Sequence, residues 1–453
     1  MKRKLVFNTS YIYLFFCTLF LLYILFKLFV VSNEVKPYYF KYLGLFLTFF
    51  IFALFSFKLN LNLKKKLNII LTTGLIILYS FEILYAYNFY SDHHYFEHRK
   101  RIKNFEKQGN EFDKTPLNKK FIYFKNKFNN VSLSIGMTNY LNEKDLEVLP
   151  LAGVSNSLTI DCNLNGFYST YISDRFGFNN FDEIWNENEI DYVFLGNSEI
   201  HNGCVEPNEN LVNLMKKNLK NTKILNLAIN STDIISHYAK LHEYTLNKKI
   251  KNVILFFDEY QDTNTNFTRL KDNFFYDLYL TDDNFTQNLI NKQSVINNFL
   301  SKKINEKIEN EAKKDKEAKQ IDKNKILKIL KLSFVRSLTI EKFFQKNNPK
   351  ILNNDFENVM KTYKDYLDDR KINFLVIYLP SHYKYINNYD PFIKSKKDVF
   401  YILDKLQIKN YDFSYIFDNS SNPSNLFPPK SYPGYSQIGY KLIAEELKKK
   451  LKY

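Results

Sequence analysis

The sequence predicts an α/β protein in which three N-terminal transmembrane helices precede a parallel sheet covered by helices on both faces. Two observations carry this prediction. The first ninety residues contain three apolar runs in succession, each about the length of a membrane-spanning helix. From about residue 190 onward, short apolar strands alternate with helical segments, a pattern typical of a parallel sheet buried on both sides.

The three apolar runs cover residues 11–31, 40–57 and 67–87, and each contains one charged residue. A helix of about 20 apolar residues crosses the hydrocarbon core of a bilayer. The first run is too long for a signal peptide, lacks a small-residue cleavage site and is followed by two more runs. We therefore expect a three-helix membrane anchor over residues 1–90 and a membrane as the first partner.

Basic residues predict the orientation of this anchor. Lys2, Arg3 and Lys4 precede the first run, and Lys58 with residues 64–66 (KKK) lies between the second and third. The positive-inside rule then places the N-terminus in the cytoplasm and everything after about residue 90 outside it, in the periplasm of a bacterial-type inner membrane. The basic stretch 98–101 argues the other way, but long domains translocate largely regardless of charge.

Composition narrows the function classes. Only 11 of the 453 residues are glycine, which excludes collagen-like and glycine-rich disordered chains. The net charge is +16, and residues 1–66 supply +9 of it, from ten Lys or Arg against Glu34. The basic excess therefore belongs mainly to the membrane segment, and we expect no nucleic-acid partner. No phosphate-binding glycine loop is present, and we expect no cofactor.

The outer domain is expected over residues 151–453, after a stalk or linker at 91–150. A helical insertion is expected at about 264–350, and its charged part, residues 300–345, has the composition of a solvated face. The strands are predicted at 192–195, 223–227, 252–257, 373–379 and 411–417, and the helices at 209–220, 233–246, 397–406 and 435–451.

Polar residues follow these strands, at the edge where open parallel sheets form their sites. They are Gly196, Asn197 and Ser198 after the first strand; Asn230, Ser231 and Thr232 after the second; Asp258, Gln261 and Asp262 after the third; Ser381 and His382 after the fourth; and Tyr432, Pro433 and Gly434 before the last helix.

Four segments in this order resemble the SGNH/GDSL hydrolase family. Residues 191–198 (DYVFLGNS) are similar to its first block, 223–231 (KILNLAINS) to the second, 253–262 (VILFFDEYQD) to the third and 435–446 (YSQIGYKLIAEE) to the last; residues 173–180 (SDRFGFNN) resemble the segment before the first block in envelope-anchored members. The resemblance implies a flavodoxin-like α/β/α sandwich and ester hydrolysis or acyl transfer, on O-acyl groups of envelope polysaccharides. In that chemistry a serine attacks a carbonyl while a histidine activates it.

The family pattern places Ser198 at the nucleophile, and Ser198, Ser231 and Gln261 at the oxyanion site. Asn197 stands where the family has aspartate, and Gly434 stands where it has the catalytic histidine. Ser431 or Tyr432 occupies the place of the orienting aspartate, and no histidine follows His382. A serine without a base is a poor nucleophile, so we expect an impaired member of the family.

Two alternatives stay open. His382 could replace the lost base with Asp258 and Asp262 orienting it, and His201 is a weaker candidate on the turn after Ser198. The chain could instead be a non-catalytic envelope protein that binds a glycan or a partner protein.

Cysteine and histidine spacing adds two expectations. Cys162 and Cys204 lie in the outer domain, where a disulfide could persist, and we expect them to pair rather than remain free thiols. His94 and His98 have a spacing that could hold a metal on a helix, but no third ligand is apparent, so a polar surface is expected and no metal.

Overall fold

The computed structural model describes all residues except 1, 31–35, 90–101, 104, 107–108, 110, 144–145, 264–272, 318–322, 337, 339–351, 353–354, 388–389, 429–433 and 452–453. The chain divides into two compact units. The first comprises Met1–Asp92 and Ile321–Phe344, and the second comprises His93–Gln320 and Gln345–Tyr453. Each unit is described by itself.

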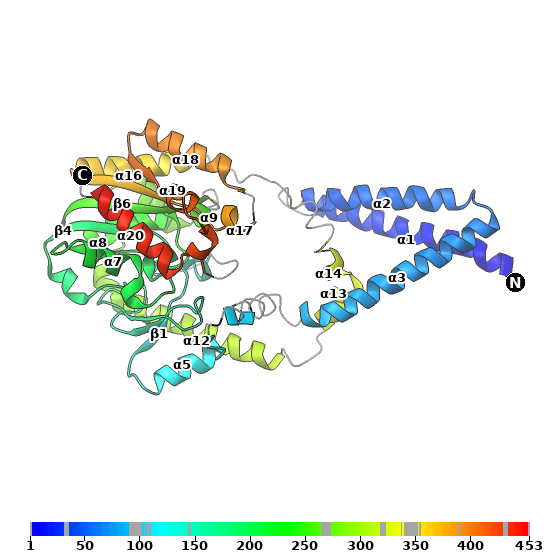
Figure 1. Cartoon of the computed structure of the whole chain (residues 1–453), viewed down its shortest axis with the longest axis horizontal. Coiled ribbons are helices and arrows are strands. Elements are labelled where there is room, and N and C mark those ends of the chain that lie inside the picture. The colour runs from blue at the N-terminus through cyan, green and yellow to red at the C-terminus, as the bar shows by residue number, and fades with distance from the viewer. Residues whose placement is uncertain are drawn as a thin grey trace. The chain divides into compact units, whose positions relative to one another are not determined.

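Three long apolar helices form most of the first unit, namely α1 (Lys2–Val30), α2 (Lys36–Ser56) and α3 (Leu61–Phe89) (Figure 1). Their candidate membrane spans, Ser10–Val30, Tyr39–Ser56 and Leu61–Tyr85, have mean hydropathies of 2.3, 1.7 and 1.9. Large apolar side chains are exposed along all three helices, as contact with lipid requires. The predicted three apolar helices at the N-terminus are therefore confirmed.

Two short helices from far along the chain complete the first unit. They are α13 (Lys323–Leu330) and α14 (Ser333–Arg336), and both contact α3 (Figure 1). We expected these residues within a solvated insertion of the outer domain. The structure instead packs them against a candidate membrane span.

The second unit is built on a five-stranded sheet with the order β5-β4-β6-β7-β8. All four neighbouring pairs are parallel, so the predicted parallel sheet is confirmed. The strands are β4 (Glu189–Leu195), β5 (Ile224–Asn226), β6 (Lys249–Asp258), β7 (Asn373–Leu379) and β8 (Lys409–Asp412).

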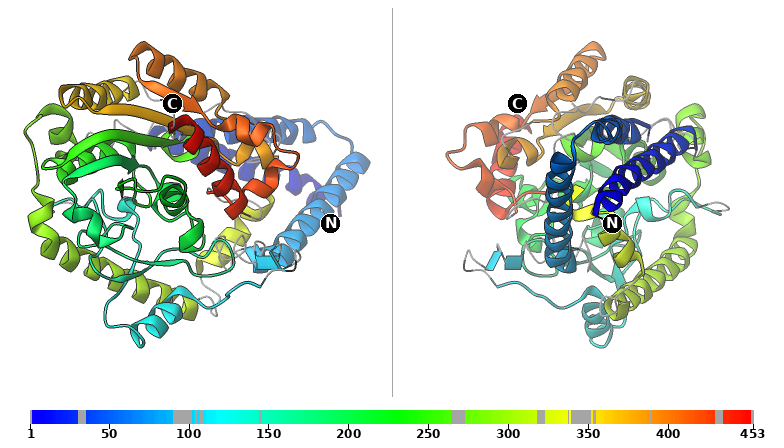
Figure 2. Two further views of the ribbon diagram at one scale, coloured as in Figure 1. Left: turned by 60° about the vertical axis from the view of Figure 1, so that its left-hand side comes forward. Right: turned by 90° about the vertical axis from the view of Figure 1, so that its right-hand side faces the viewer.

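Apolar side chains fill both faces of this sheet. Alternate residues of β4 and β6 enter two separate core clusters; Val193 and Val253 join one, and Phe194 and Ile254 join the other. The first cluster also contains residues of α8 (Ile234–Thr245), α16 (Phe356–Asp369) and α18 (Ile393–Lys405). The second contains residues of α7 (Leu211–Asn218) and α20 (Gln437–Leu451) (Figure 2). The unit is thus three-layered.

Smaller elements extend the first core cluster. A three-stranded sheet of β1 (Val131–Leu133), β2 (Leu158–Ile160) and β3 (Thr170–Ile172) forms where the sequence shows no regular pattern. Beside it lie α5 (Leu117–Lys125) and α12 (Gln293–Glu317), and α11 (Phe274–Thr281) contacts α8.

The last strand differs from the expectation. We expected it over residues 411–417, but β8 ends at Asp412 and the chain turns into α19 (Ser414–Asp418). The Asp412 carboxylate accepts a hydrogen bond from the backbone N–H of Ser414 at 2.9 Å, which favours a turn over further extension. The aromatic residues Phe413 and Phe417 are fully buried in the second core cluster, so their apolar character reflects helix packing and not a strand.

Candidate active site

Ser198 and Gln261 meet at the carboxyl end of the sheet. Ser198 begins the short helix α6 (Ser198–His201) directly after β4, and Gln261 lies in α9 (Glu259–Thr263) directly after β6. The Gln261 Nε2 donates a hydrogen bond to Ser198 Oγ at 3.0 Å. After β4, the next strand, β5, lies on one side of β4, and the strand after that, β6, lies on the other side. The carboxyl end of β4 is therefore the switch point at which open α/β sheets bind ligands.

Asn197 links the three strand ends that surround Ser198. Its side-chain oxygen accepts a hydrogen bond from the Thr232 backbone N–H at 2.9 Å, and its Nδ2 donates to Asp262 at 3.3 Å. The side chain is 1% exposed. Asn197 therefore holds the loops after β5 and β6 against α6.

Ser231 has the backbone conformation of a glycine. Its φ is 53°, in the left-handed region that costs a residue with a Cβ about 1 kcal/mol or more. The family pattern has its oxyanion glycine at this place. Ser231 precedes Thr232, whose backbone N–H donates to the Asn197 side-chain oxygen.

Three acidic side chains lie beneath Ser198. Ser198 Oγ donates to Glu199 Oε2 at 3.3 Å. Burial, and then the charge of Asp258, raises the pKa of Glu199 well above its ordinary value, and Glu199 Oε1 has no hydrogen-bond partner within the described residues. Burial also raises the pKa of Asp262, whose carboxylate accepts from the Asp258 N–H at 2.7 Å. Burial thus favours the protonated form of the carboxyl group that contacts the serine hydroxyl.

The candidate histidines make other contacts. The His382 ring lies 4.5 Å from the Tyr383 ring and 6.4 Å from that of Phe427, and burial lowers its pKa to about 4. His201 Nδ1 contacts the Ala228 carbonyl oxygen at 3.0 Å. Within the described chain, the side-chain hydrogen bonds of Ser198 are those with Gln261 and Glu199, so the structure brings neither histidine to it.

Gly434 is the residue that the sequence resemblance aligns with a catalytic histidine. Gly434 has a φ of 106°, and a Cβ added to it would meet no atom within 4 Å among the described residues. Ser431 and Tyr432, the expected replacements for the orienting aspartate, lie outside the described residues. No imidazole from this part of the chain is available to the serine.

The two outer cysteines are joined in the structure. Cys162 and Cys204 form a disulfide with their Cα atoms 5.6 Å apart, and Cys17 in α1 is a free thiol. A carboxylate oxygen of Asp161 lies within 4.8 Å of both sulfur atoms, but sulfurs bonded to each other are not thiolate ligands. His94 and His98 lie outside the described residues.

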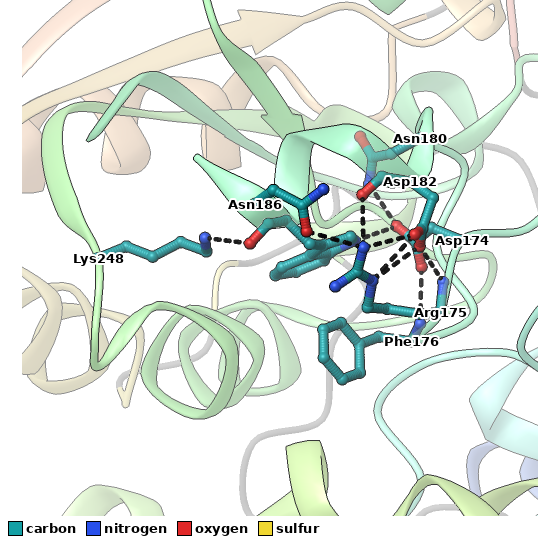
Figure 3. A network of polar contacts seen from close by, with 8 residues as sticks. Asp174, Arg175, Phe176, Asn180, Asp182, Asn186 and Lys248 are labelled. Carbon is teal, nitrogen blue, oxygen red and sulfur yellow. Dashed lines mark hydrogen bonds and ion pairs between the residues drawn. The ribbon is translucent and has the colours of Figure 1, made fainter. Parts of the chain in front are cut away.

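A network of polar contacts surrounds Asp174 and Arg175 (Figure 3). The Asp174 carboxylate accepts four hydrogen bonds, from the backbone N–H groups of Phe176 and Phe178, from Asn180 Nδ2 and from Trp185 Nε1. Burial raises its pKa to about 6.

Asn180 carries this network to the sheet. Its side chain exchanges two hydrogen bonds of 2.9 Å with the backbone of Asn226 in β5, and Asn226 Nδ2 donates to the Ile200 carbonyl in α6 at 3.3 Å. Residues 173–180, which resemble the segment before the first SGNH/GDSL block, therefore have a structural role, because they fix the helix that begins with Ser198.

Two residues near the site were not anticipated. Glu199 could have been noticed as the residue next to the candidate nucleophile, but nothing in the sequence indicates that its side chain is 2% exposed and faces the serine hydroxyl. Lys240 in α8 is fully buried, its Nζ donates to Thr232 Oγ1 at 3.4 Å, and burial lowers its pKa to about 7. A lysine in a helix normally predicts a solvated face.

Comparisons with known proteins are sparse. No family model matches the chain, and no curated protein matches it. Among solved structures, it is similar to a protein described as lipolytic and of the G-D-S-L family from Desulfitobacterium hafniense DCB-2. The identity is 12% and the TM-score 0.30, over 58% of this chain and 99% of that one. A likeness at this TM-score carries no weight in the arguments that follow.

Proposed function

We propose that the second unit is an SGNH/GDSL hydrolase-like domain with a flavodoxin-like α/β/α sandwich, and that its ancestral reaction is O-acyl ester hydrolysis or acyl transfer on envelope glycans. The strand order supports this, because numbering the five strands along the chain gives 2-1-3-4-5. The observation that carries the proposal is the contact of Ser198 Oγ with the Gln261 amide, at the place where the family pattern puts a nucleophile and an oxyanion donor.

Catalysis is impaired in this proposal. Gly434 stands where the family pattern has its histidine, and the described groups that contact the serine hydroxyl are the Gln261 amide and the buried Glu199 carboxyl, whose pKa burial raises. Loss of a triad member costs several orders of magnitude in rate and leaves only the contributions of binding and the oxyanion site. The cleft then acts mainly as a binding site for an acylated glycan.

The test is ester turnover and fluorophosphonate labelling by the full chain in detergent micelles. We expect hydrolysis near the background rate and slow labelling that Ser198→Ala abolishes. Ser301→Ala, at an exposed position of α12, is the matched control and leaves the labelling unchanged. Robust hydrolysis that is lost in Ser198→Ala but not in Ser301→Ala refutes the impaired state.

Glu199 supports a second candidate, an esterase with a carboxyl base. Its carboxylate form accepts the serine proton without rearrangement, since the two oxygens are already 3.3 Å apart. Because burial and then the charge of Asp258 raise the pKa of Glu199 well above its ordinary value, this activity rises with pH as Glu199 loses its proton. If Glu199→Gln removes the rise of esterase activity with pH and His382→Gln leaves it, Glu199 is favoured as the substitute base. If His382→Gln removes the rise and Glu199→Gln leaves it, His382 is favoured.

The orientation is part of the proposal. The first unit anchors the chain in a bacterial-type inner membrane with the N-terminus in the cytoplasm and the second unit in the periplasm, near envelope polysaccharides. Alkaline phosphatase fused after residue 453 is then active, since it folds only outside the cytoplasm. An inactive fusion, together with a fluorescent cytoplasmic reporter at the same point, contradicts the orientation.

A further inference from the structure

The segment of α13 and α14 packs against α3, a candidate membrane span that lies about 240 residues earlier in the chain. The Glu82 carboxylate in α3 accepts hydrogen bonds from the backbone N–H groups of Phe334 at 3.0 Å and Val335 at 2.9 Å. The Tyr79 hydroxyl donates to the Leu330 carbonyl at 2.9 Å. The last residue of α13 and two residues of α14 are thus hydrogen-bonded to α3.

Aromatic packing reinforces these bonds. The Phe334 ring stacks on Tyr85 with 5.9 Å between centroids and an interplanar angle of 7°, and it lies 5.9 Å from the Phe81 ring. Phe334 is buried, and the Arg336 guanidinium lies 5.8 Å from the Tyr42 ring of α2. The segment therefore packs against two of the three apolar helices.

The contact lies in the C-terminal part of the candidate membrane span of α3. Tyr79, Glu82 and Tyr85 all fall within the candidate span Leu61–Tyr85. A carboxylate inside a span is costly unless its oxygens are satisfied, and here backbone N–H groups satisfy both oxygens while Glu82 is 0% exposed. The segment explains how this span tolerates an acidic residue.

The other side of the segment is apolar and exposed. Ile326, Leu327 and Leu330 are 49%, 50% and 59% exposed, and lysines occur at positions 328 and 331 among them. Apolar side chains next to a membrane span, interleaved with lysines, match the boundary between acyl chains and anionic headgroups.

We propose that residues 323–336 form a membrane-inserted segment whose exposed apolar side chains contact lipid at the end of α3 from which the chain continues into the second unit. The occupant of this surface is the bilayer itself, because the surface is continuous with a span that already requires lipid around it.

The test is a depth measurement by nitroxide spin labels on the full chain, reconstituted in vesicles of phosphatidylcholine and phosphatidylglycerol. Leu327→Cys and Leu330→Cys carry the label in a Cys17→Ser background. Leu246→Cys, a leucine of the second unit that is 45% exposed, is the matched control. We expect oxygen to relax the labels at 327 and 330 several-fold more than a water-soluble nickel complex does, and the reverse at 246.

A label at 327 that is as accessible to the nickel complex as the label at 246 overturns the proposal. Two further variants test the attachment. Glu82→Gln loses one acceptor, and Tyr79→Phe loses the bond to Leu330, so each raises the mobility of the label at 330. Unchanged mobility in both variants shows that α3 does not hold the segment, which also overturns the proposal. Either result is independent of whether Ser198 is catalytic.

Discussion

Gly177→Ala tests whether Gly177 is required because the backbone of another segment lies too close to it for a side chain. Gly177 has a φ of 89°, and a Cβ there would lie 2.1 Å from the backbone oxygen of Gly153. The left-handed conformation alone costs an alanine about 1–2 kcal/mol. The overlap adds about 1–3 kcal/mol, because the obstacle is backbone and cannot rotate away.

Gly109→Ala is the matched control. Its φ of 81° is nearly the same, but a Cβ there meets nothing within 4 Å among the described residues. The conformational cost is therefore common to both variants, and their difference measures the overlap. We expect a loss of about 2–5 kcal/mol in the free energy of unfolding for Gly177→Ala. For Gly109→Ala we expect no more than about 2 kcal/mol.

The assay is denaturant unfolding of the full chain in detergent micelles, followed by tryptophan fluorescence. Trp185 is the single tryptophan of the chain, and it donates to Asp174 in the loop that contains Gly177. The signal therefore reports on the second unit and not on the apolar helices. Equal destabilisation by the two variants, within about 0.5 kcal/mol, refutes the steric argument.

Three further results are expected in the same assay. Burial holds the pKa of Lys240 near 7, below its ordinary 10.5, so above pH 7 the unfolded chain binds more protons than the folded chain does. The free energy of unfolding therefore rises by about 2 kcal/mol between about pH 7 and 9. The Lys240→Met variant flattens that rise. Replacing both Cys162 and Cys204 by alanine costs about 4 kcal/mol by loop entropy for a separation of 42 residues, and an unchanged denaturation midpoint contradicts this. Asp182→Ala breaks an ion pair with Arg175 whose side chains are 43% and 38% exposed, so it costs under about 1 kcal/mol, and a larger loss shows that the pair is coupled to Asp174.

Local sequence signals predicted the elements whose boundaries are set locally. The strand at 373–379 was predicted with its observed bounds, because an apolar run ends at Pro380 and nothing competes with extension. The strand predicted at 411–417 was wrong beyond Asp412, because the Asp412 side chain accepts a hydrogen bond from the Ser414 N–H and so favours a turn. Three apolar runs of membrane-spanning length gave three helices, because length and hydropathy are sufficient signals.

The rest of the site depends on contacts between distant residues. The approach of Gln261 to Ser198 requires two neighbouring strands in register, and the burial of Glu199 requires the helices that cover the sheet. Residues 323–336 were expected on a solvated face because they fall within the stretch 300–345, which is rich in lysine and glutamate. Their partner Glu82 lies about 250 residues earlier, and the local periodicity of a sequence does not predict a contact between residues so far apart.

The division of the chain into two units has a consequence for anchoring. The chain passes between the units three times, at residues 92–93, 320–321 and 344–345. A protein held by one linker is released by one cut, whereas here a break between α3 and the second unit leaves that unit joined to a segment packed on α3. Retention of the second unit therefore does not depend on any single peptide bond.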